Sequence, residues 1–191
     1  MNRRTSVKSI LGLGVLGISS FSIFRWIGLH QKLDLQSLLS YKVLITDLAE
    51  TIIPKTDTPG AKEAGVENYI INVLTNCTGR IEQNKFLNGL ADLEEYTQDN
   101  FGKTFKNCTA ADKVSILSYF ENKDKYSVAI LNKVNNKFLG RSFFTQLKNL
   151  TIEGYCTSQI GATQGLAYDF IPSTFQSCIP LTAHQKSWAT K

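Results

Sequence analysis

The stretch LAETIIPKTDTPGAKEAGVENY, residues 48–69, decides how this chain folds. Apolar residues in and before it recur at four-residue intervals in two adjacent rows, which predicts a helix with one wide buried face. The rows are Leu44, Leu48 and Ile52, and Ile45, Ala49 and Ile53. Pro54 ends this helix because it has no N–H and biases the preceding residue away from helical geometry. Turn-forming residues fill positions 55–60, and a second helix is expected to start within residues 61–63, so the stretch predicts a helical hairpin.

Later parts of the chain also have helical patterns. Residues 80–101 predict a long helix, and Gly102 offers its stop signal. Thr109 and Asp112 have the spacing of a capping box, which predicts the start of a short helix. Residues 138–157 predict a further helix. These helices could pack on the hairpin to form a small bundle.

Two other features complete the predicted fold. Phe143 and Phe144 could belong to the core or to a contact surface, and the core is favoured because large aromatic side chains are mostly buried. Residues 31–39 are expected to be a connection. From Gly161 onward glycines and prolines break every helical pattern, so an irregular tail is expected, which needs a staple or a partner. The predicted fold class is all-α: a small helical bundle, residues 31–191, with an N-terminal export or anchor helix and an irregular C-terminal tail.

The first thirty residues form a separate leader. A charged start is followed by the apolar run ILGLGVLGISSFSIF, which predicts an export signal or an anchor. Arg3, Arg4 and Lys8 resemble a twin-arginine signal, and an ordinary secretion signal is the alternative. No A-x-A cleavage site follows, and residues 10–29 are about long enough to span a bilayer. We therefore expect a periplasmic protein that an uncleaved leader could anchor to the inner membrane.

The charge of the chain is concentrated in the leader. The formal net charge is +5, with 21 basic and 16 acidic residues. Arg3, Arg4, Lys8 and Arg25 lie in the leader, and without them 17 basic residues remain against 16 acidic ones. Lysines in the rest of the chain are scattered among acidic residues, as on an ordinary solvated surface. We therefore expect no nucleic-acid binding.

Four cysteines, Cys77, Cys108, Cys156 and Cys178, lie far apart in the sequence. The absence of C-x-x-C and C-x-x-C-H patterns argues against covalent haem and against a compact zinc or iron–sulfur site. An exported chain meets an oxidising compartment, where an even number of cysteines favours disulfides. Of the three possible pairings we prefer Cys77–Cys108 with Cys156–Cys178, the second of which would pin the tail to the last helix. Free buried thiols, or a bridge to another subunit, are the alternatives.

The residues suited to catalysis are few. His30 and His184 are the only histidines, one beside the leader and one near the C-terminus. Glu50, Glu63 and Glu67 lie around the hairpin loop, and paired carboxylates could do acid–base work. Such carboxylates more often cap helices or solvate a face, and Asp57 is expected to bond its own backbone. The composition therefore favours a protein with no catalytic residues, no metal site and no cofactor of its own.

Residues 50–66, ETIIPKTDTPGAKEAGV, closely resemble the signature of the gluconate 2-dehydrogenase small subunit (subunit 3) family. The resemblance extends to residues 154–161, GYCTSQIG, and to the tail at residues 178–181. It implies an accessory subunit that accompanies a large flavin-dependent sugar or polyol dehydrogenase subunit, with FAD on that partner. It is also compatible with a cytochrome c subunit in the same complex. The leader would then be the part that contacts the membrane.

The resemblance implies a non-catalytic subunit that stabilises the flavoprotein and aids its twin-arginine export. The loop and the tail after Gly161 are the expected contact surfaces. The candidate contact residues are Pro54, Asp57, Pro59, Gly60, Tyr155 and Gly161. Two alternatives remain: a self-sufficient periplasmic enzyme that uses Glu50, Asp57 and Glu67, and a free-standing anchored binding module.

Overall fold

A computed structural model describes residues 34–123, 141–171, 178, 180 and 183–189 of the chain. Its elements are α2 (Leu35–Ser40), α3 (Lys42–Ile52), α4 (Val66–Asn76), α5 (Arg80–Phe101), the 3-10 helix η1 (Phe105–Asn107), α6 (Ala110–Lys123), α8 (Phe143–Thr157) and the π-helix η2 (Gly161–Gly165). Within these ranges there is no β-strand, and one isolated bridge joins Ala167 to Trp188. The predicted all-α bundle is confirmed.

Helices α3 and α4 form the predicted hairpin, with two differences at its boundaries. The second helix starts at Val66, because residues 61–65 form turns in which the Val66 N–H donates to the Ala61 carbonyl at 3.2 Å. The expected connection before α3 contains the short helix α2. Asp34 caps it, since its carboxylate accepts hydrogen bonds from the Gln36 N–H at 3.0 Å and the Ser37 hydroxyl at 2.6 Å.

The two predicted helix boundaries after the hairpin are confirmed. Helix α5 ends at Gly102, which adopts the left-handed conformation. Thr109 and Asp112 form a reciprocal capping box at the start of α6. The Asp112 N–H donates to the Thr109 hydroxyl oxygen at 3.2 Å, and the Asp112 carboxylate accepts from the Thr109 N–H at 3.3 Å.

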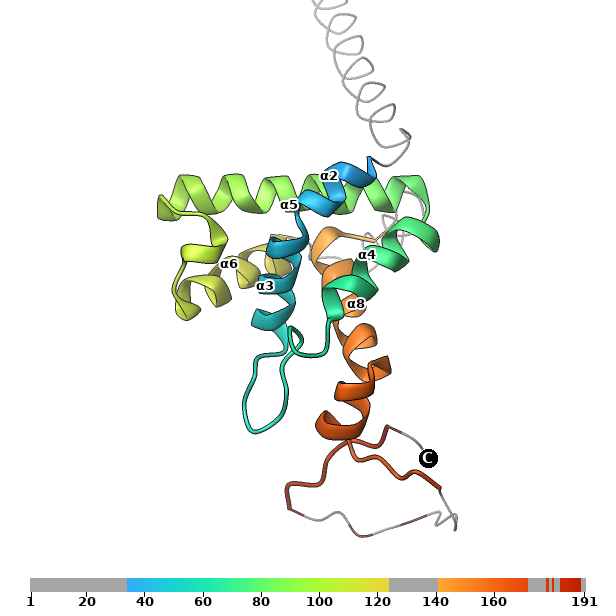
Figure 1. Cartoon of the computed structure of the whole chain (residues 1–191). Helices are drawn as coiled ribbons and strands as arrows, with labels where there is room; N and C mark the ends of the chain where they lie inside the picture. Colours follow the sequence, from blue (N-terminus) through green and yellow to red (C-terminus); the bar gives the residue numbers. More distant parts are fainter. Residues whose placement is uncertain (1–33, 124–140, 172–177, 179, 181–182, 190–191) are drawn as a thin grey trace, which may run out of the picture.

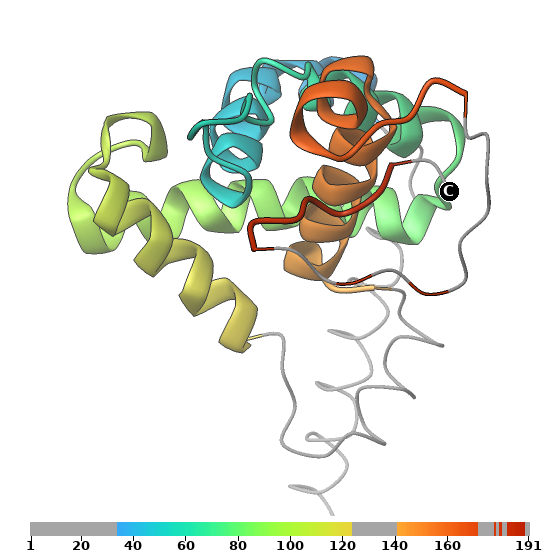
Figure 2. The ribbon, with the colours of Figure 1, turned by 90° about the horizontal axis from the view of Figure 1, so that it is seen from below.

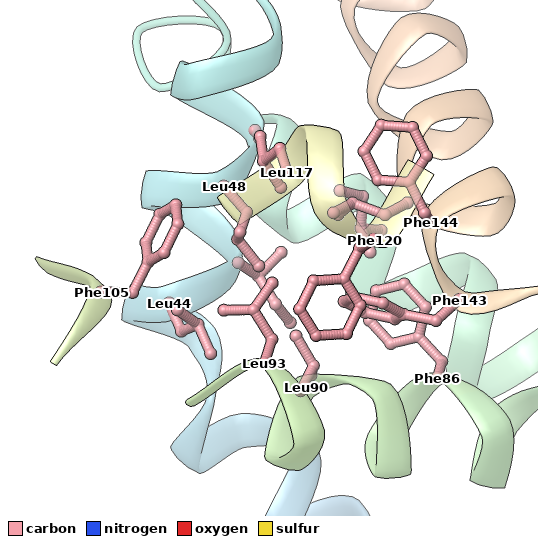
Figure 3. Close-up of a cluster of buried hydrophobic side chains, with 14 of the residues drawn as sticks. Leu44, Leu48, Phe86, Leu90, Leu93, Phe105, Leu117, Phe120, Phe143 and Phe144 are labelled. Carbon is pink, nitrogen blue, oxygen red and sulfur yellow. The ribbon is translucent and has the colours of Figure 1, made fainter. Parts of the chain in front are cut away.

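Helix α8 packs against α3, α4, α5 and α6 and so lies at the centre of the bundle. Figure 1 shows α5 crossing one end of the molecule, with α3, α4 and α8 below it. Phe143 and Phe144 are both buried, which confirms their predicted place in the core. In Figure 3 the Phe143 side chain lies between those of Phe86 and Phe120. The ring centroids of Phe86 and Phe143 are 5.3 Å apart with an edge-to-face geometry that favours aromatic contact.

The bundle therefore has two distinct ends. Helices α5 and α2 lie at one end, and the α3–α4 loop and the tail after α8 lie at the other (Figure 1). Figure 2, seen from below, brings the loop and the described parts of the tail to the viewer's side. None of the helices in the described ranges is both long enough and apolar enough to span a bilayer.

Candidate docking site

The α3–α4 loop, residues 54–61, is closed at its neck by the carboxylate of Glu50. One carboxylate oxygen accepts the Lys55 N–H at 3.0 Å, and the other accepts the Lys62 N–H at 2.8 Å. Because Pro54 has no N–H, Lys55 carries the first backbone donor after it. Gly60 leaves room for the carboxylate, since a Cβ there would lie 2.5 Å from both Glu50 oxygens. The Glu50 side chain thus holds together the two ends of the loop, at the point where the loop leaves the bundle.

The tip of the loop projects into solvent. Pro54 and Asp57 are exposed, and Pro59 is partly buried. Asp57 does not bond its own backbone as expected: its carboxylate accepts a hydrogen bond from the Thr56 hydroxyl at 2.9 Å. Lys55 also forms an ion pair with Glu63 beside the tip. Because these two side chains are exposed, the pair adds little stability.

Tyr155 of α8 connects the loop to the far end of the sequence. Its hydroxyl donates a hydrogen bond of 2.7 Å to the Pro59 carbonyl, although the two residues are 96 positions apart. The Tyr155 side chain is buried, and Gly165 of η2 lies against its ring. Gly161 is buried as well, and a Cβ there would collide with the Tyr155 carbonyl. The two segments singled out in the sequence, residues 50–66 and 154–161, therefore meet in space.

The tail beyond η2 is held by its own backbone. The Ala167 N–H donates to the Ser187 carbonyl, and the Ala189 N–H donates to the Ala167 carbonyl, both at 2.8 Å. The Lys186 ammonium also donates to the Gln164 carbonyl at 2.6 Å. The prediction that the tail is irregular from Gly161 is wrong for its first residues, because Gly161–Gly165 form the π-helix η2. Beyond η2 this backbone pairing, and not a disulfide, joins the described parts of the tail.

Apolar side chains are exposed on this tail. Phe170 is 81% exposed and Ile171 is 71% exposed, while Tyr168 and Trp188 are each 43% exposed. Large apolar side chains exposed on a protein surface are a common feature of interaction sites, so these four are candidates for a contact. We call residues 54–59 of the loop together with residues 168–171 and Trp188 the docking face.

A family model for the gluconate 2-dehydrogenase subunit 3 family matches residues 41–172, which is more than half of the chain. The chain belongs to this family. The match starts at the residue before α3 and runs through the loop, Tyr155, η2 and residues 168–171 of the tail. No curated protein and no solved structure matches the chain.

The acidic residues of this subunit 3 protein have separate surroundings. Glu50 is occupied by two backbone donors, and Asp57 lies at the exposed tip. Glu67, in the first turn of α4, accepts a hydrogen bond from the Asn68 side chain at 3.0 Å with one oxygen, and its other oxygen is buried without a partner among the described residues. None of the three lines the cavity that lies between α3 and α5.

The preferred disulfides are absent from the structure, in which all four cysteines are free thiols. Cys77 and Cys108 lie beyond opposite ends of α5, whose 22 residues make it about 33 Å long at about 1.5 Å per residue. A disulfide needs Cα atoms within about 7 Å. Cys108 is buried and its thiol donates to the Thr104 carbonyl at 3.5 Å, while Cys156 and Cys178 are exposed. Burial raises the pKa of the Cys108 thiol and so favours its protonated form.

Other predicted positions fall at the two ends of the chain. Arg3, Arg4 and Lys8 of the leader lie outside the described residues, as does His30. His184 is exposed in a turn of the tail.

The contact that sequence reasoning missed is the hydrogen bond from the Tyr155 hydroxyl to the Pro59 carbonyl. Tyr155 was chosen as a candidate, but no local pattern indicates that its hydroxyl reaches the loop.

Proposed function

We propose that this chain is the non-catalytic small subunit of a membrane-associated, FAD-dependent sugar or polyol dehydrogenase. It binds the large flavoprotein subunit through the docking face and stabilises it. Its leader, with Arg3, Arg4 and Lys8, assists twin-arginine export of the folded complex to the periplasm. FAD belongs to the partner, and a cytochrome c subunit would complete electron transfer.

The observation that carries this proposal is the hydrogen bond from Tyr155 to the Pro59 carbonyl. It joins the two most characteristic segments of the chain at one end of the bundle. The tail segment that carries the exposed residues Phe170 and Ile171 leaves α8 at the same end (Figure 1). A loop already held in one conformation loses less entropy when a partner binds it. Exposed aromatic and aliphatic side chains at the same end of the bundle can supply the apolar contacts that protein interfaces need.

The position of the docking face also suits an exported or anchored subunit. Asp34, the first described residue, lies at the α2 end of the bundle, and the docking face lies at the opposite end (Figure 1). The chain can bind its partner before export, which the twin-arginine route requires of a protein without its own signal.

The proposal is tested by co-expressing the full-length chain, tagged, with the flavoprotein subunit of the same complex. We expect the tagged chain to retain the flavoprotein, measured by flavin absorbance in the eluate. The double variant Phe170→Ser/Ile171→Ser should lower this recovery at least about tenfold, which corresponds to about 1.4 kcal/mol. Val114→Ser on α6 is the matched control, because Val114 is 56% exposed but lies outside the docking face.

Two outcomes would overturn the proposal. The first is that the wild-type chain retains no flavoprotein, or retains it equally after the double substitution. The second is that the purified chain alone oxidises a sugar or polyol, as a self-sufficient enzyme would. Export is scored separately: Arg3→Lys/Arg4→Lys should leave the complex intact but keep it in the cytoplasm.

A further inference from the structure

Two apolar side chains are exposed where the described part of the chain begins, near the end of the bundle that carries α2 (Figure 1). Leu39 of α2 is 49% exposed and Val43 of α3 is 58% exposed. They lie four positions apart, on either side of the turn at Tyr41. The neighbouring Leu38 and Ile45 are buried and already supply the contacts of α2 and α3 with the core. Leu39 and Val43 are therefore a second apolar set that stays exposed in the folded bundle.

The charges around this set differ from those on α5 at the same end of the bundle. Residues 35–46 contain no Asp or Glu, and the exposed Lys42 is their only charged residue. Helix α5, by contrast, exposes three acids: Asp92, Glu95 and Asp99. Apolar side chains beside a lysine and without acids are typical of helices at a bilayer interface, where the lysine reaches the headgroups. We call Leu39, Lys42 and Val43 the α2–α3 surface.

The α2–α3 surface also follows closely after the leader. In the proposed function, on which this inference rests, the leader is an anchor whose residues 10–29 span the bilayer. Residues 30–33 separate that run from Asp34, the N-cap of α2, and fully extended they span at most about 18 Å. Leu39 follows within α2, at a further distance of about 8 Å. A tether this short raises the effective concentration of the bilayer at the α2–α3 surface, so that even a weak contact is populated.

A lipid surface fits this patch better than a second protein does. Specific protein interfaces bury at least about 1,200 Å² in total, and two half-exposed side chains are a small part of that. A bilayer contact has no such requirement, because the anchor supplies the affinity. Lys106, Asp47 and Glu94 line the hollow beside Val43, so charges of both signs border the patch. This mixture suits zwitterionic headgroups and does not select anionic lipids.

We propose that the α2–α3 surface lies on the bilayer, with the Leu39 and Val43 side chains at the boundary between headgroups and acyl chains and Lys42 among the headgroup phosphates. The contact orients the bundle relative to the membrane. Because the docking face lies at the opposite end of the bundle from α2 (Figure 1), this orientation holds the docking face away from the lipid.

The test uses the full-length chain in phosphatidylcholine nanodiscs, with one chain in each disc. Phosphatidylcholine that carries a nitroxide near the top of its acyl chain broadens the NMR signals of amides close to it. We expect selective broadening of the Leu39, Lys42 and Val43 amides, whereas the amide of Val114, which is 56% exposed on α6, should stay sharp. Discs that also contain phosphatidylglycerol should give the same pattern.

The double variant Leu39→Ser/Val43→Ser should lower the broadening of the Lys42 amide at least about tenfold, because it removes the apolar groups that enter the bilayer. Val114→Ser is the matched control, since it makes the same kind of change outside the α2–α3 surface, and it should leave that broadening unchanged. A circular dichroism spectrum checks that each variant is folded.

Several results would overturn the inference. Equal broadening at Val114 and Lys42 would show that the bundle has no preferred side toward the lipid. Sharp Leu39 and Val43 signals in the discs would show that the leader or nothing at all covers the surface. Broadening that requires phosphatidylglycerol, or that survives the double substitution, would contradict an apolar contact. A chain that fails to enter the discs would overturn the anchor as well, whereas flavoprotein recovery is scored separately and tests the docking face alone.

Discussion

At the α5 end of the bundle the Phe143 ring packs against those of Phe86 and Phe120. At the loop end, by contrast, the Glu50 and Tyr155 side chains hold the backbone by individual hydrogen bonds. The first arrangement stabilises the fold through buried apolar area, which does not depend on direction. The second contributes less free energy but fixes the position of particular backbone groups. The contrast suggests that stability and recognition reside in different parts of the molecule.

The two ends should therefore respond differently to substitution. At the aromatic end, loss of volume creates a cavity, and the free energy of unfolding falls. At the loop end, loss of one hydrogen bond leaves the bundle folded but releases the loop. Partner binding should follow the loop end closely and the aromatic end weakly, provided that the protein remains folded.

The largest expected effect comes from Phe86→Ala. Phe86 is fully buried, and its ring meets Phe143 edge-to-face. The substitution should lower the free energy of unfolding by about 3–5 kcal/mol, measured by urea denaturation. Phe170→Ala makes the same chemical change at a residue that is 81% exposed, and should change stability by less than about 0.5 kcal/mol. Similar urea midpoints for the two variants would show that the aromatic cluster does not stabilise the bundle.

Below its unfolding transition, the Phe86→Ala variant should still retain the flavoprotein, whereas Phe170→Ala should retain less of it. This reversal is the sharpest form of the comparison, because the more destabilised variant is expected to bind better. If binding followed stability in both variants, the two ends would not be functionally separate.

Much of the helical framework could be predicted from the sequence. The apolar rows around Leu48 and the stop at Pro54 predict α3 closely, and residues 80–101 match α5 at both ends. The capping box at Thr109 was also recognised. These features depend on neighbours within one or two helical turns. The cap of α2 is equally local: Asp34, four residues before the apolar pair Leu38 and Leu39, was an N-cap signal that the expected connection overlooked.

The docking site could be predicted only in part. The segments that form it were identified, but the bond from Tyr155 to Pro59 depends on how α8 packs beside the hairpin. Glu50 was interpreted as a helix-end carboxylate, whereas it also reaches the Lys62 N–H across the loop. The preferred Cys77–Cys108 bridge was wrong because it ignored the length of the helix between the two residues.

The next effect in size is that of Glu50→Gln. The NH2 group that replaces one carboxylate oxygen cannot accept a hydrogen bond, so either the Lys55 N–H or the Lys62 N–H loses its partner. Stability should fall by about 1–3 kcal/mol. The two amide protons should exchange with solvent faster than in the wild type, measured by hydrogen exchange. Flavoprotein recovery should fall with them.

Glu63→Gln is the control for Glu50→Gln, because Glu63 forms only an exposed ion pair with Lys55. It should cost about 0–1 kcal/mol and leave the exchange of the Lys62 amide unchanged. If both variants accelerated exchange equally, the loop would be held by surface charge and not by the Glu50 carboxylate.

The smallest expected effect is that of Tyr155→Phe, which removes one hydroxyl and keeps the ring. The Pro59 carbonyl loses its donor, which should lower the free energy of unfolding by about 0.5–1.5 kcal/mol in urea denaturation. The backbone NMR shifts of residues 56–60 should change, while those of α5 should not. Because the loop is then no longer tied to α8, flavoprotein recovery should fall by more than the stability loss alone would explain.

Tyr119→Phe is the matched control for Tyr155→Phe, since it also removes one hydroxyl from a ring that keeps its packing. Tyr119 is 42% exposed and stacks on Tyr96, with ring centroids 4.2 Å apart. Its loss should leave stability, loop shifts and recovery near wild-type values. If Tyr155→Phe behaved like Tyr119→Phe, the bond to Pro59 would not position the loop. Partner binding would then be assigned to the apolar residues of the tail, because only their substitution would lower flavoprotein recovery.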